Sequence, residues 1–273
     1  MKNYKPILVV AGEPNSIFLE IFFKSIKKIK IKNPIILICS FKLLSLQMRK
    51  LNIKKKIRII KHEKIFHSYL NNSCINLIDV NYKAKSAFSK VTNKSNEYIK
   101  NCFELAIYLI KKKGIYKFIN GPINKKIFLK KNHLGITEYI SKKFRIKKKA
   151  MLIYNKKLSV CTVTTHLPIK LVSKKINQSN IMEKIELIEN FYNKNLSIKP
   201  RIGVLGLNPH CESILNYNED DKIIKPLVKK MLKKGLRISG PISADTAFLK
   251  NNRKNYDVII GMYHDQVITP IKT

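Results

Sequence analysis

Three histidines are the residues whose type and context could support chemistry: His166, His210 and His264. Each follows an apolar stretch that is typical of a buried strand, namely residues 159–163, 202–207 and 258–262. Open parallel sheets bind ligands beyond the carboxyl ends of their strands, where loops converge. Three neutral imidazoles that leave one position open can form a catalytic site for a divalent metal ion. One such histidine is more often a structural residue, but three in the same context favour a shared site, which the fold must assemble.

Length and composition indicate a globular protein. The chain has 273 residues, of which 45% are hydrophobic, enough for one large α/β domain or two smaller lobes. No apolar run reaches the roughly 18 residues that a membrane span needs, and no signal peptide is evident, so we expect no membrane partner. The five cysteines include no C-x-x-C pair, which indicates reduced thiols in a cytoplasmic protein.

The net charge of +38 raises the question of a nucleic-acid partner. Only six of the 55 basic residues are arginine, although specific phosphate and base recognition favours the guanidinium group. The lysines are spread over the whole chain beside many Ile and Asn, a pattern that A/T-rich codons explain. We therefore expect no specific nucleic-acid binding, but a positive field that favours anionic substrates.

Strands and helices alternate along the first part of the chain. The pattern predicts strands at 6–11, 34–39, 57–60 and 74–80, with helices at 17–28, 42–51 and 95–113. Ser16 is the expected N-cap of the first helix, and Gly114 the expected stop of the third. Such an alternation is typical of a parallel sheet with right-handed crossovers.

The second part of the chain continues this pattern with one interruption. Residues 150–154 and 157–163 are expected to form an antiparallel hairpin inserted in the parallel sheet. A short helix is expected from Pro168 and longer ones at 178–194 and 220–234.

Two loops of the chain carry further candidate residues. After a strand at 116–119, Gly121 would let backbone approach a ligand, and Lys125 near a helix start suits a phosphate. Thr137 is either a helix cap or a hydroxyl donor to a substrate. Asp245 lies at another loop-to-helix junction, where its carboxylate is available to a site.

Six motifs in this order resemble those of the 4-hydroxythreonine-4-phosphate dehydrogenase family of vitamin B6 biosynthesis. They are Gly121–Lys125, Gly135–Glu138, Thr164–Pro168, Leu207–His210, Ala244–Thr246 and Met262–Gln266. The resemblance implies a two-lobed α/β/α fold like that of isocitrate and isopropylmalate dehydrogenases. We accordingly expect a first lobe at 1–120, a second lobe with dimer contacts at 121–250, and a return strand toward the first lobe at 251–273.

The resemblance also implies a reaction: the oxidation of 4-phosphooxy-L-threonine by NAD or NADP. The product, 2-amino-3-oxo-4-phosphooxybutanoate, loses carbon dioxide to give 3-amino-2-oxopropyl phosphate. The family holds a divalent metal, zinc or else Mg or Co, and its ligands match His166, His210 and His264 here. The resemblance implies that these ligands are shared at the interface of a homodimer. A bound cation would stabilise the developing alkoxide. No G-x-G-x-x-G fingerprint is present, so the nicotinamide cofactor rests on the resemblance.

Four more residues have expected roles, two of them from the resemblance and two from the chemistry of the implied reaction. Thr137 and Lys272 match family contacts to the substrate, and Asp245 or Asp265 orients a ligand histidine or relays the proton. Ile136 departs from the family, which has a histidine there, and family members continue beyond the point where this chain ends. The alternatives are a truncated, inactive homologue, a metal-dependent hydrolase or lyase of a small phosphorylated substrate, and, more remotely, a basic nucleic-acid-binding protein.

Overall fold

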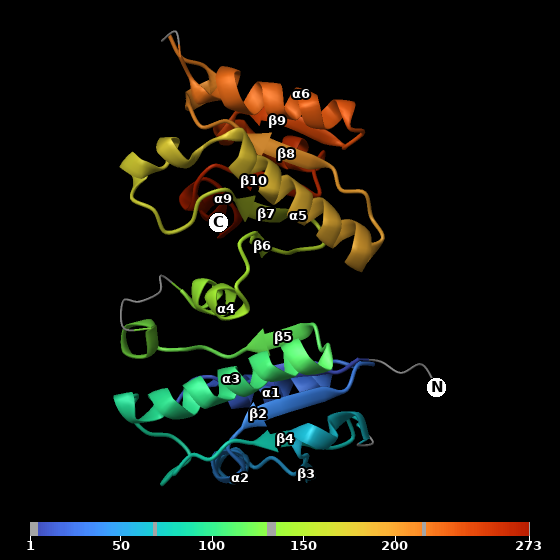
Figure 1. Ribbon diagram of the computed structural model, residues 1–273, viewed down its shortest axis with the longest axis vertical. Coiled ribbons are helices and arrows are strands. Elements are labelled where there is room, and N and C mark those ends of the chain that lie inside the picture. Colours follow the sequence, from blue (N-terminus) through green and yellow to red (C-terminus); the bar gives the residue numbers. More distant parts are fainter. Residues whose placement is uncertain (1–4, 68–69, 130–134, 215–216, 273) are drawn as a thin grey trace. The chain divides into compact units, whose positions relative to one another are not determined.

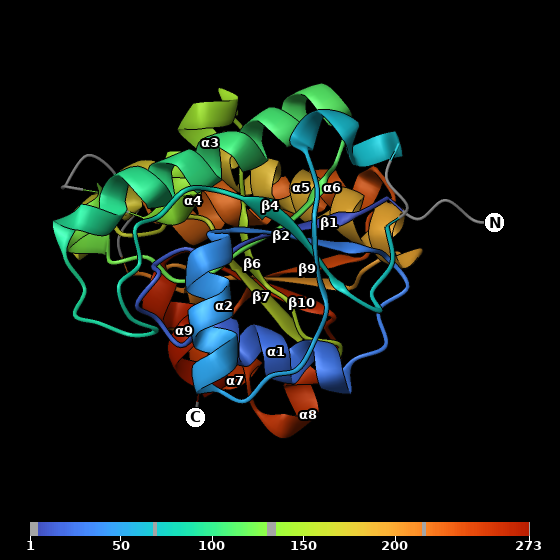
Figure 2. The ribbon, with the colours of Figure 1, turned by 90° about the horizontal axis from the view of Figure 1, so that it is seen from below.

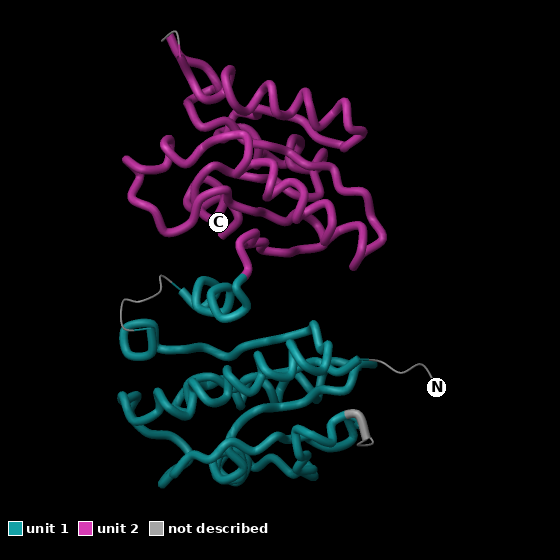
Figure 3. Tube along the Cα trace, viewed as in Figure 1, with its two compact units in different colours: residues 1–145 teal, residues 146–273 magenta. Residues whose placement is uncertain are grey.

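The computed structural model describes residues 5–67, 70–129, 135–214 and 217–272, which fall into two compact units (Figure 1). The first unit is Met1–Arg145 and the second Ile146–Thr273 (Figure 3). Each unit has its own sheet and its own apolar clusters, which is the mark of an independent core. The α/β fold expected from the sequence is thereby confirmed. Within the described residues, no helix combines the length and apolar character that crossing a bilayer requires.

The first unit contains a five-stranded parallel sheet in the order β3-β4-β2-β1-β5. Its strands are β1 (Ile7–Val10), β2 (Ile35–Cys39), β3 (Ile57–Ile59), β4 (Ile75–Asp79) and β5 (Lys117–Asn120). Helices α1 (Phe18–Lys28) and α2 (Phe41–Lys50) cover one face, and α3 (Asn96–Lys113) covers the other (Figure 2). The central strands β1, β2 and β4 are largely buried because helices cover both faces of the sheet, whereas Ile59 of β3 and Ile119 of β5 are exposed.

The two predicted helix ends in this unit had different outcomes. Gly114 is the C-cap of α3 with φ 60°, in the left-handed region that glycine enters at little cost, so this prediction is confirmed. Ser16 is not the N-cap of α1, because the helix begins at Phe18 after Ile17. The Ser16 hydroxyl instead donates to the Glu13 carbonyl at 2.8 Å and accepts from the Phe18 N–H at 3.3 Å, within the preceding turn.

The second unit contains a mixed sheet in the order β6-β7-β10-β8-β9. Its strands are β6 (Met151–Ile153), β7 (Ser159–Thr162), β8 (Ile202–Leu205), β9 (Ile238–Ile242) and β10 (Val258–Gly261). Strand β6 pairs antiparallel with β7, as predicted, and the other neighbours are parallel. The sequence reading missed β9, whose Gly240 and Pro241 interrupt the apolar pattern. At the edge of the sheet a proline is tolerated, because one side of the strand needs no partner.

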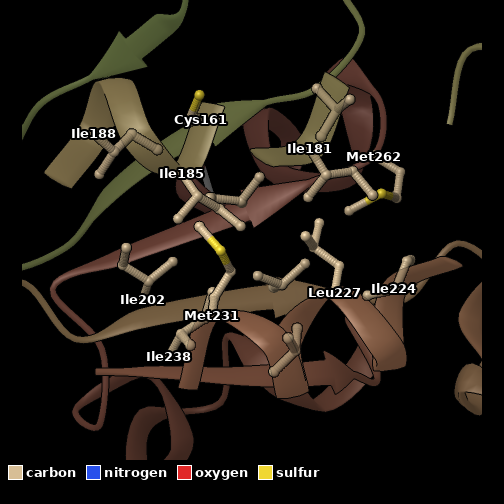
Figure 4. Close-up of a cluster of buried hydrophobic side chains, with 14 of the residues drawn as sticks. Cys161, Ile181, Ile185, Ile188, Ile202, Ile224, Leu227, Met231, Ile238 and Met262 are labelled. Atoms are coloured by element: carbon tan, nitrogen blue, oxygen red, sulfur yellow. The ribbon is translucent and has the colours of Figure 1, made fainter. Parts of the chain in front are cut away.

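Helices cover both faces of the second sheet. Helices α5 (Gln178–Leu196) and α6 (Lys225–Lys233) pack on one face, where Ile181, Ile185, Leu227 and Met231 point into a shared cluster (Figure 4). On the other face lie α7 (Ala244–Ala247) and α9 (His264–Lys272), and the short α8 (Lys250–Arg253) follows α7 (Figure 2). The predicted helix from Pro168 is a pair of short 3-10 turns, Ile169–Leu171 and Ser173–Lys175. This core holds in place the ends of the strands that precede the candidate loops.

The division between the units differs from the expected boundary after residue 120. Residues 121–145, which include α4 (Ile136–Phe144), stay with the first unit because Leu129 and Tyr139 are buried in its core. Residues 251–273 do not return to the first unit. Strand β10 lies at the centre of the second sheet, hydrogen-bonded between β7 and β8, so that expectation was wrong.

Candidate functional site

The three candidate histidines lie in loops that follow strands at the same edge of the second sheet. His166, His210 and His264 follow β7, β8 and β10, which are adjacent and parallel, so their carboxyl ends point the same way. The strand-end placement predicted from the sequence is therefore found. Loops at this edge of a parallel sheet are where such folds bind ligands.

His166 and His264 lie beside each other. Their ring centroids are 6.0 Å apart, and both rings line a hollow of about 190 Å³. Thr164, Tyr263 and Asp265 add polar atoms to its wall, and apolar side chains from the segment after β7 complete it. The hollow has room for a small polar ligand, and its two imidazoles give it metal-binding chemistry.

The His264 ring is oriented by its neighbour in the chain. His264 Nδ1 lies 2.7 Å from Asp265 Oδ1 at the start of α9. A carboxylate at Nδ1 favours the tautomer whose Nε2 keeps a lone pair, the arrangement found in many metal-ligating histidines. Thr164 joins this loop to the His166 loop, because its hydroxyl and its N–H both donate to the Met262 carbonyl, at 2.7 and 3.1 Å.

His210 belongs to a separate pair. Its Nδ1 lies 3.5 Å from Asp245 Oδ2 at the start of α7, and both side chains are mostly exposed. The Ser243 hydroxyl, 2.5 Å from Asp245, and the charge of His210 hold the pKa of the Asp245 carboxyl below its ordinary value. Asp245 thus stands where the sequence reading placed it, at a loop-to-helix junction beside a candidate histidine.

Two of the three histidines have unusual backbone conformations. His166 has φ 50° and His210 has φ 53°, and Cys211 beside the latter has φ 62°. Non-glycine residues adopt this left-handed region rarely, and such strain concentrates where a loop must present a side chain in one direction. The backbone at both positions must therefore be stabilised by its surroundings.

Asp220 supplies that stabilisation for the His210 loop. Its carboxylate is fully buried and accepts hydrogen bonds from Leu207 N at 2.7 Å, Asn208 N at 3.0 Å and Asn208 Nδ2 at 2.9 Å. Gly206 leaves the space for it, since a Cβ there would lie 2.8 Å from Asp220 Oδ1. Sequence reasoning missed Asp220. The one available signal was an acidic pair opening a predicted helix shortly after a candidate loop.

Gln266 connects the His210 and His264 loops. Its Oε1 accepts from Met262 N at 2.7 Å, at the end of β10, and its Nε2 donates to the Gly206 carbonyl at 2.7 Å, just after β8. One side chain thereby closes the ends of two neighbouring strands. Together with Thr164 and Asp220, it links all three histidine loops in one hydrogen-bonded framework.

The complete metal triad is not assembled within this one chain. Over the parts of the chain that the structure describes, no three His, Cys, Asp or Glu side chains lie close enough to hold an ion together. The geometry supplies two half-sites instead. One consists of His166 with His264, and the other of His210 with Asp245. The donor types suit zinc or a related divalent ion, although each pair by itself has too few ligands.

The remaining candidates are exposed or serve the fold. Lys125 and Thr137 are exposed in the first unit, at the start of a short π-helix and in the first turn of α4, and Lys272 is exposed near the end of α9. Thr137 is not the helix cap, which is Gly135. Ile136, where the family has a histidine, packs partly buried against the first core.

Gly121 has a structural role that differs from the expected one. A Cβ at this position would lie 2.1 Å from the Ala11 carbonyl oxygen, so the residue allows the strand ends of β1 and β5 to approach. The Gly121 N–H donates to the Val10 carbonyl at 2.7 Å and extends the β1–β5 pairing. Close backbone packing, rather than the approach of a ligand, accounts for the glycine.

Comparisons with known proteins agree on one family. A family model described as pyridoxal phosphate biosynthetic protein PdxA matches residues 30–273. The chain is 33% identical to a 4-hydroxythreonine-4-phosphate dehydrogenase of Sulfurihydrogenibium, over 97% of this chain and 82% of that protein. It is 28% identical to a D-threonate 4-phosphate dehydrogenase of Pectobacterium atrosepticum, over 98% and 84%. A crystal structure of 4-hydroxythreonine-4-phosphate dehydrogenase from Klebsiella pneumoniae matches with a TM-score of 0.80 and 28% identity, covering 98% of this chain and 84% of that one.

Proposed function

The chain belongs to the PdxA family of pyridoxal phosphate biosynthetic proteins, and from this premise we propose that it is a dehydrogenase of a small phosphorylated hydroxy acid. The proposed reaction is the oxidation of 4-phosphooxy-L-threonine to 2-amino-3-oxo-4-phosphooxybutanoate, which then decarboxylates to 3-amino-2-oxopropyl phosphate. The observation that carries this proposal is the meeting of His166 and His264 around a hollow at the carboxyl edge of the second sheet.

The proposed metal ligands are His166, His210 and His264. The neutral imidazole set suits zinc, with Mg or Co as the other candidates. Since the described residues of one chain offer two half-sites and no triad, we propose that the ligands are shared between the copies of a homodimer. This arrangement would supply the third donor that each half-site needs.

The oxidation requires the loss of a proton from the alcohol oxygen and of a hydride from its carbon. A divalent cation supplies stabilisation of the developing alkoxide, and NAD or NADP supplies the hydride acceptor. Asp265 orients the His264 ring through a contact of 2.7 Å at Nδ1, and Asp245, 3.5 Å from His210 Nδ1, is placed to do the same for His210 when the metal site forms. Either carboxylate can take the proton, since each lies in the first turn of a helix beside a candidate histidine.

Three cationic or hydroxyl side chains are proposed to bind the substrate. Lys125 and Lys272 offer ammonium groups for its phosphate and carboxylate, and Thr137 offers a hydroxyl. All three are exposed in the structure and therefore accessible. The five cysteines are free thiols, four of them buried, which supports a reducing, cytoplasmic setting.

A direct assay tests this function. The purified protein is mixed with 4-phosphooxy-L-threonine, a divalent metal, and NAD or NADP, and the absorbance of the reduced nicotinamide is followed. The proposal predicts reduction that is lost in His166→Ala and His264→Ala but retained in His62→Ala, a histidine of the first unit. Absence of reduction with both cofactors and all three metals, in protein shown to be folded, would reject the proposal.

D-Threonate 4-phosphate is a second candidate substrate, because relatives of that name match 98% of this chain. It carries a hydroxyl where 4-phosphooxy-L-threonine carries an amino group. Running both compounds in the same assay separates them by kcat/KM.

A further inference from the structure

A hollow of about 360 Å³, the lysine hollow, lies in the first unit. Three segments of the chain line it: the end of α1, residues 53–56 before β3, and Ser73 before β4. Each of these segments precedes a strand of the parallel sheet, so the hollow lies at the amino edge of that sheet. Its volume falls within the usual range of ligand sites, roughly 300–1,000 Å³.

This edge of the sheet is opposite the one that carries a proposed substrate contact. Lys125 follows β5, which is parallel to β1, so it leaves the carboxyl edge of the same sheet. The lysine hollow shares no lining residue with the proposed active site. A ligand bound there takes no part in the proposed reaction.

The cations of the lysine hollow have no acidic partner. Four lysines line it: Lys27, Lys54, Lys55 and Lys56. The described residues of its lining include no carboxylate, and across the described chain none of the four lysines forms an ion pair. Ammonium groups gathered in one concavity repel one another, and an anion bound among them relieves that repulsion. A phosphate monoester, with roughly two negative charges at neutral pH, suits this field better than a carboxylate with a single charge.

The floor of the lysine hollow is apolar. Phe23, only 1% exposed, belongs to the apolar cluster beneath α1 and α2, and Ile26 and Ile53 pack against that cluster. A narrow hollow of about 30 Å³ adjoins this side, because it shares Ile26 and Lys55 with the lysine hollow, and isoleucines form half of its lining. A bound molecule can therefore bury an apolar group against the floor while its charge stays among the lysines.

Hydrogen bonds hold the walls of the lysine hollow in place. Lys55 Nζ donates to the Asn72 carbonyl at 3.1 Å and joins the segment before β3 to the segment before β4. The Asn72 side chain donates to the carbonyls of Ile31 and Asn33, each at 2.9 Å, and accepts from Ile35 N at 2.9 Å. The segment after α1 is thereby tied to the same point. A site whose walls are already ordered loses less free energy when a ligand binds.

We propose that the lysine hollow binds a small organic phosphate whose body is apolar. The phosphate group lies among the exposed side chains of Lys27, Lys54 and Lys56, and the apolar body contacts Ile26 and Ile53 on the floor. Neither contact depends on the dehydrogenase reaction, so this site stands or falls independently of the proposed function.

The test measures binding of phenyl phosphate, the simplest compound of this class. Calorimetric titration of the full chain is compared for the wild type and the double variant Lys27→Ala/Lys54→Ala, whose side chains are both exposed. Removal of two cationic contacts should weaken binding roughly tenfold. The matched control is Lys229→Ala/Lys233→Ala, which removes two exposed lysines from α6 in the second unit and should bind as the wild type does.

A second comparison tests the apolar floor. Inorganic phosphate carries the charge without the apolar body, so it should bind the wild type more weakly than phenyl phosphate. Weakening confined to Lys27→Ala/Lys54→Ala, with every variant folded by circular dichroism, supports the proposal. Equal weakening in both double variants overturns it, because net charge then accounts for the binding. No weakening in either variant, or equal affinity for inorganic phosphate and phenyl phosphate, also overturns it.

Discussion

Asp220→Asn should destabilise the second unit and disturb the His210 loop. The substitution keeps the volume of the side chain, removes its charge, and turns an amide N–H toward groups that are themselves donors. Hydrogen bonds to charged groups contribute about 1.5–3 kcal/mol each, and a buried donor left unpaired costs a similar amount. Losing one or two of the three bonds therefore lowers the free energy of unfolding by about 3 kcal/mol.

That loss converts to a shift that thermal unfolding can measure. A unit of the size of residues 146–273 has an unfolding entropy of about 0.27 kcal/mol per degree, so its melting temperature should fall by roughly 10 °C. Asp221→Asn is the matched control, because that adjacent carboxylate is exposed and pairs with Lys225 at the surface. If the two variants melt within about 2 °C of each other, the buried carboxylate does not support the loop as argued.

The remaining predictions concern backbone packing and pH. Gly121→Ala should lower the free energy of unfolding of the first unit by about 3 kcal/mol or more, since the new Cβ would meet the Ala11 carbonyl. Gly235→Ala should lower the free energy of unfolding by only about 1 kcal/mol, because the space around Gly235 is open. Urea titration compares the two variants. Burial raises the pKa of Asp257, but the hydrogen bonds and the charge of Arg201 lower it by more than burial raises it. The pKa of Asp257 is therefore below its ordinary value. Its stabilising effect is therefore complete above the unfolded pKa of about 3.9 and is lost as the pH falls through the lower folded pKa. Asp257→Asn should thus lower the free energy of unfolding by about 1 kcal/mol at neutral pH. If the melting temperatures of wild type and variant differ by the same amount at pH 7 and at pH 2, this reasoning is contradicted.

Local patterns were sufficient to predict most of the architecture. Apolar runs such as 202–207 and 258–262 became buried parallel strands, because a strand covered on both faces must be apolar at every position. The helix stop at Gly114 and the antiparallel hairpin of β6 and β7 were readable for the same reason, since turn chemistry acts over a few residues. The common edge of the three histidine loops follows directly from the parallel order of the strands.

Features that depend on distant contacts were not readable. The role of Gln266 exists only when the ends of β8 and β10 are neighbours, and that of Asp220 only when its helical turn packs against the loop after β8. No local pattern expresses either contact. Gly121 was interpreted as a ligand approach, but its requirement comes from Ala11, far away in the chain. The attachment of residues 121–145 to the first unit likewise depends on where Leu129 and Tyr139 are buried.

The central claim is that His166, His210 and His264, contributed by two copies of the chain, bind one metal ion, and the metal content of the purified protein tests it most directly. The wild type and the variants His166→Ala, His210→Ala, His264→Ala and His62→Ala are loaded with zinc, desalted and analysed by mass spectrometry. The account predicts about one zinc per chain in the wild type and in His62→Ala, and a loss of most of it in each of the other three. Full retention of zinc in any one of those three variants would contradict the claim.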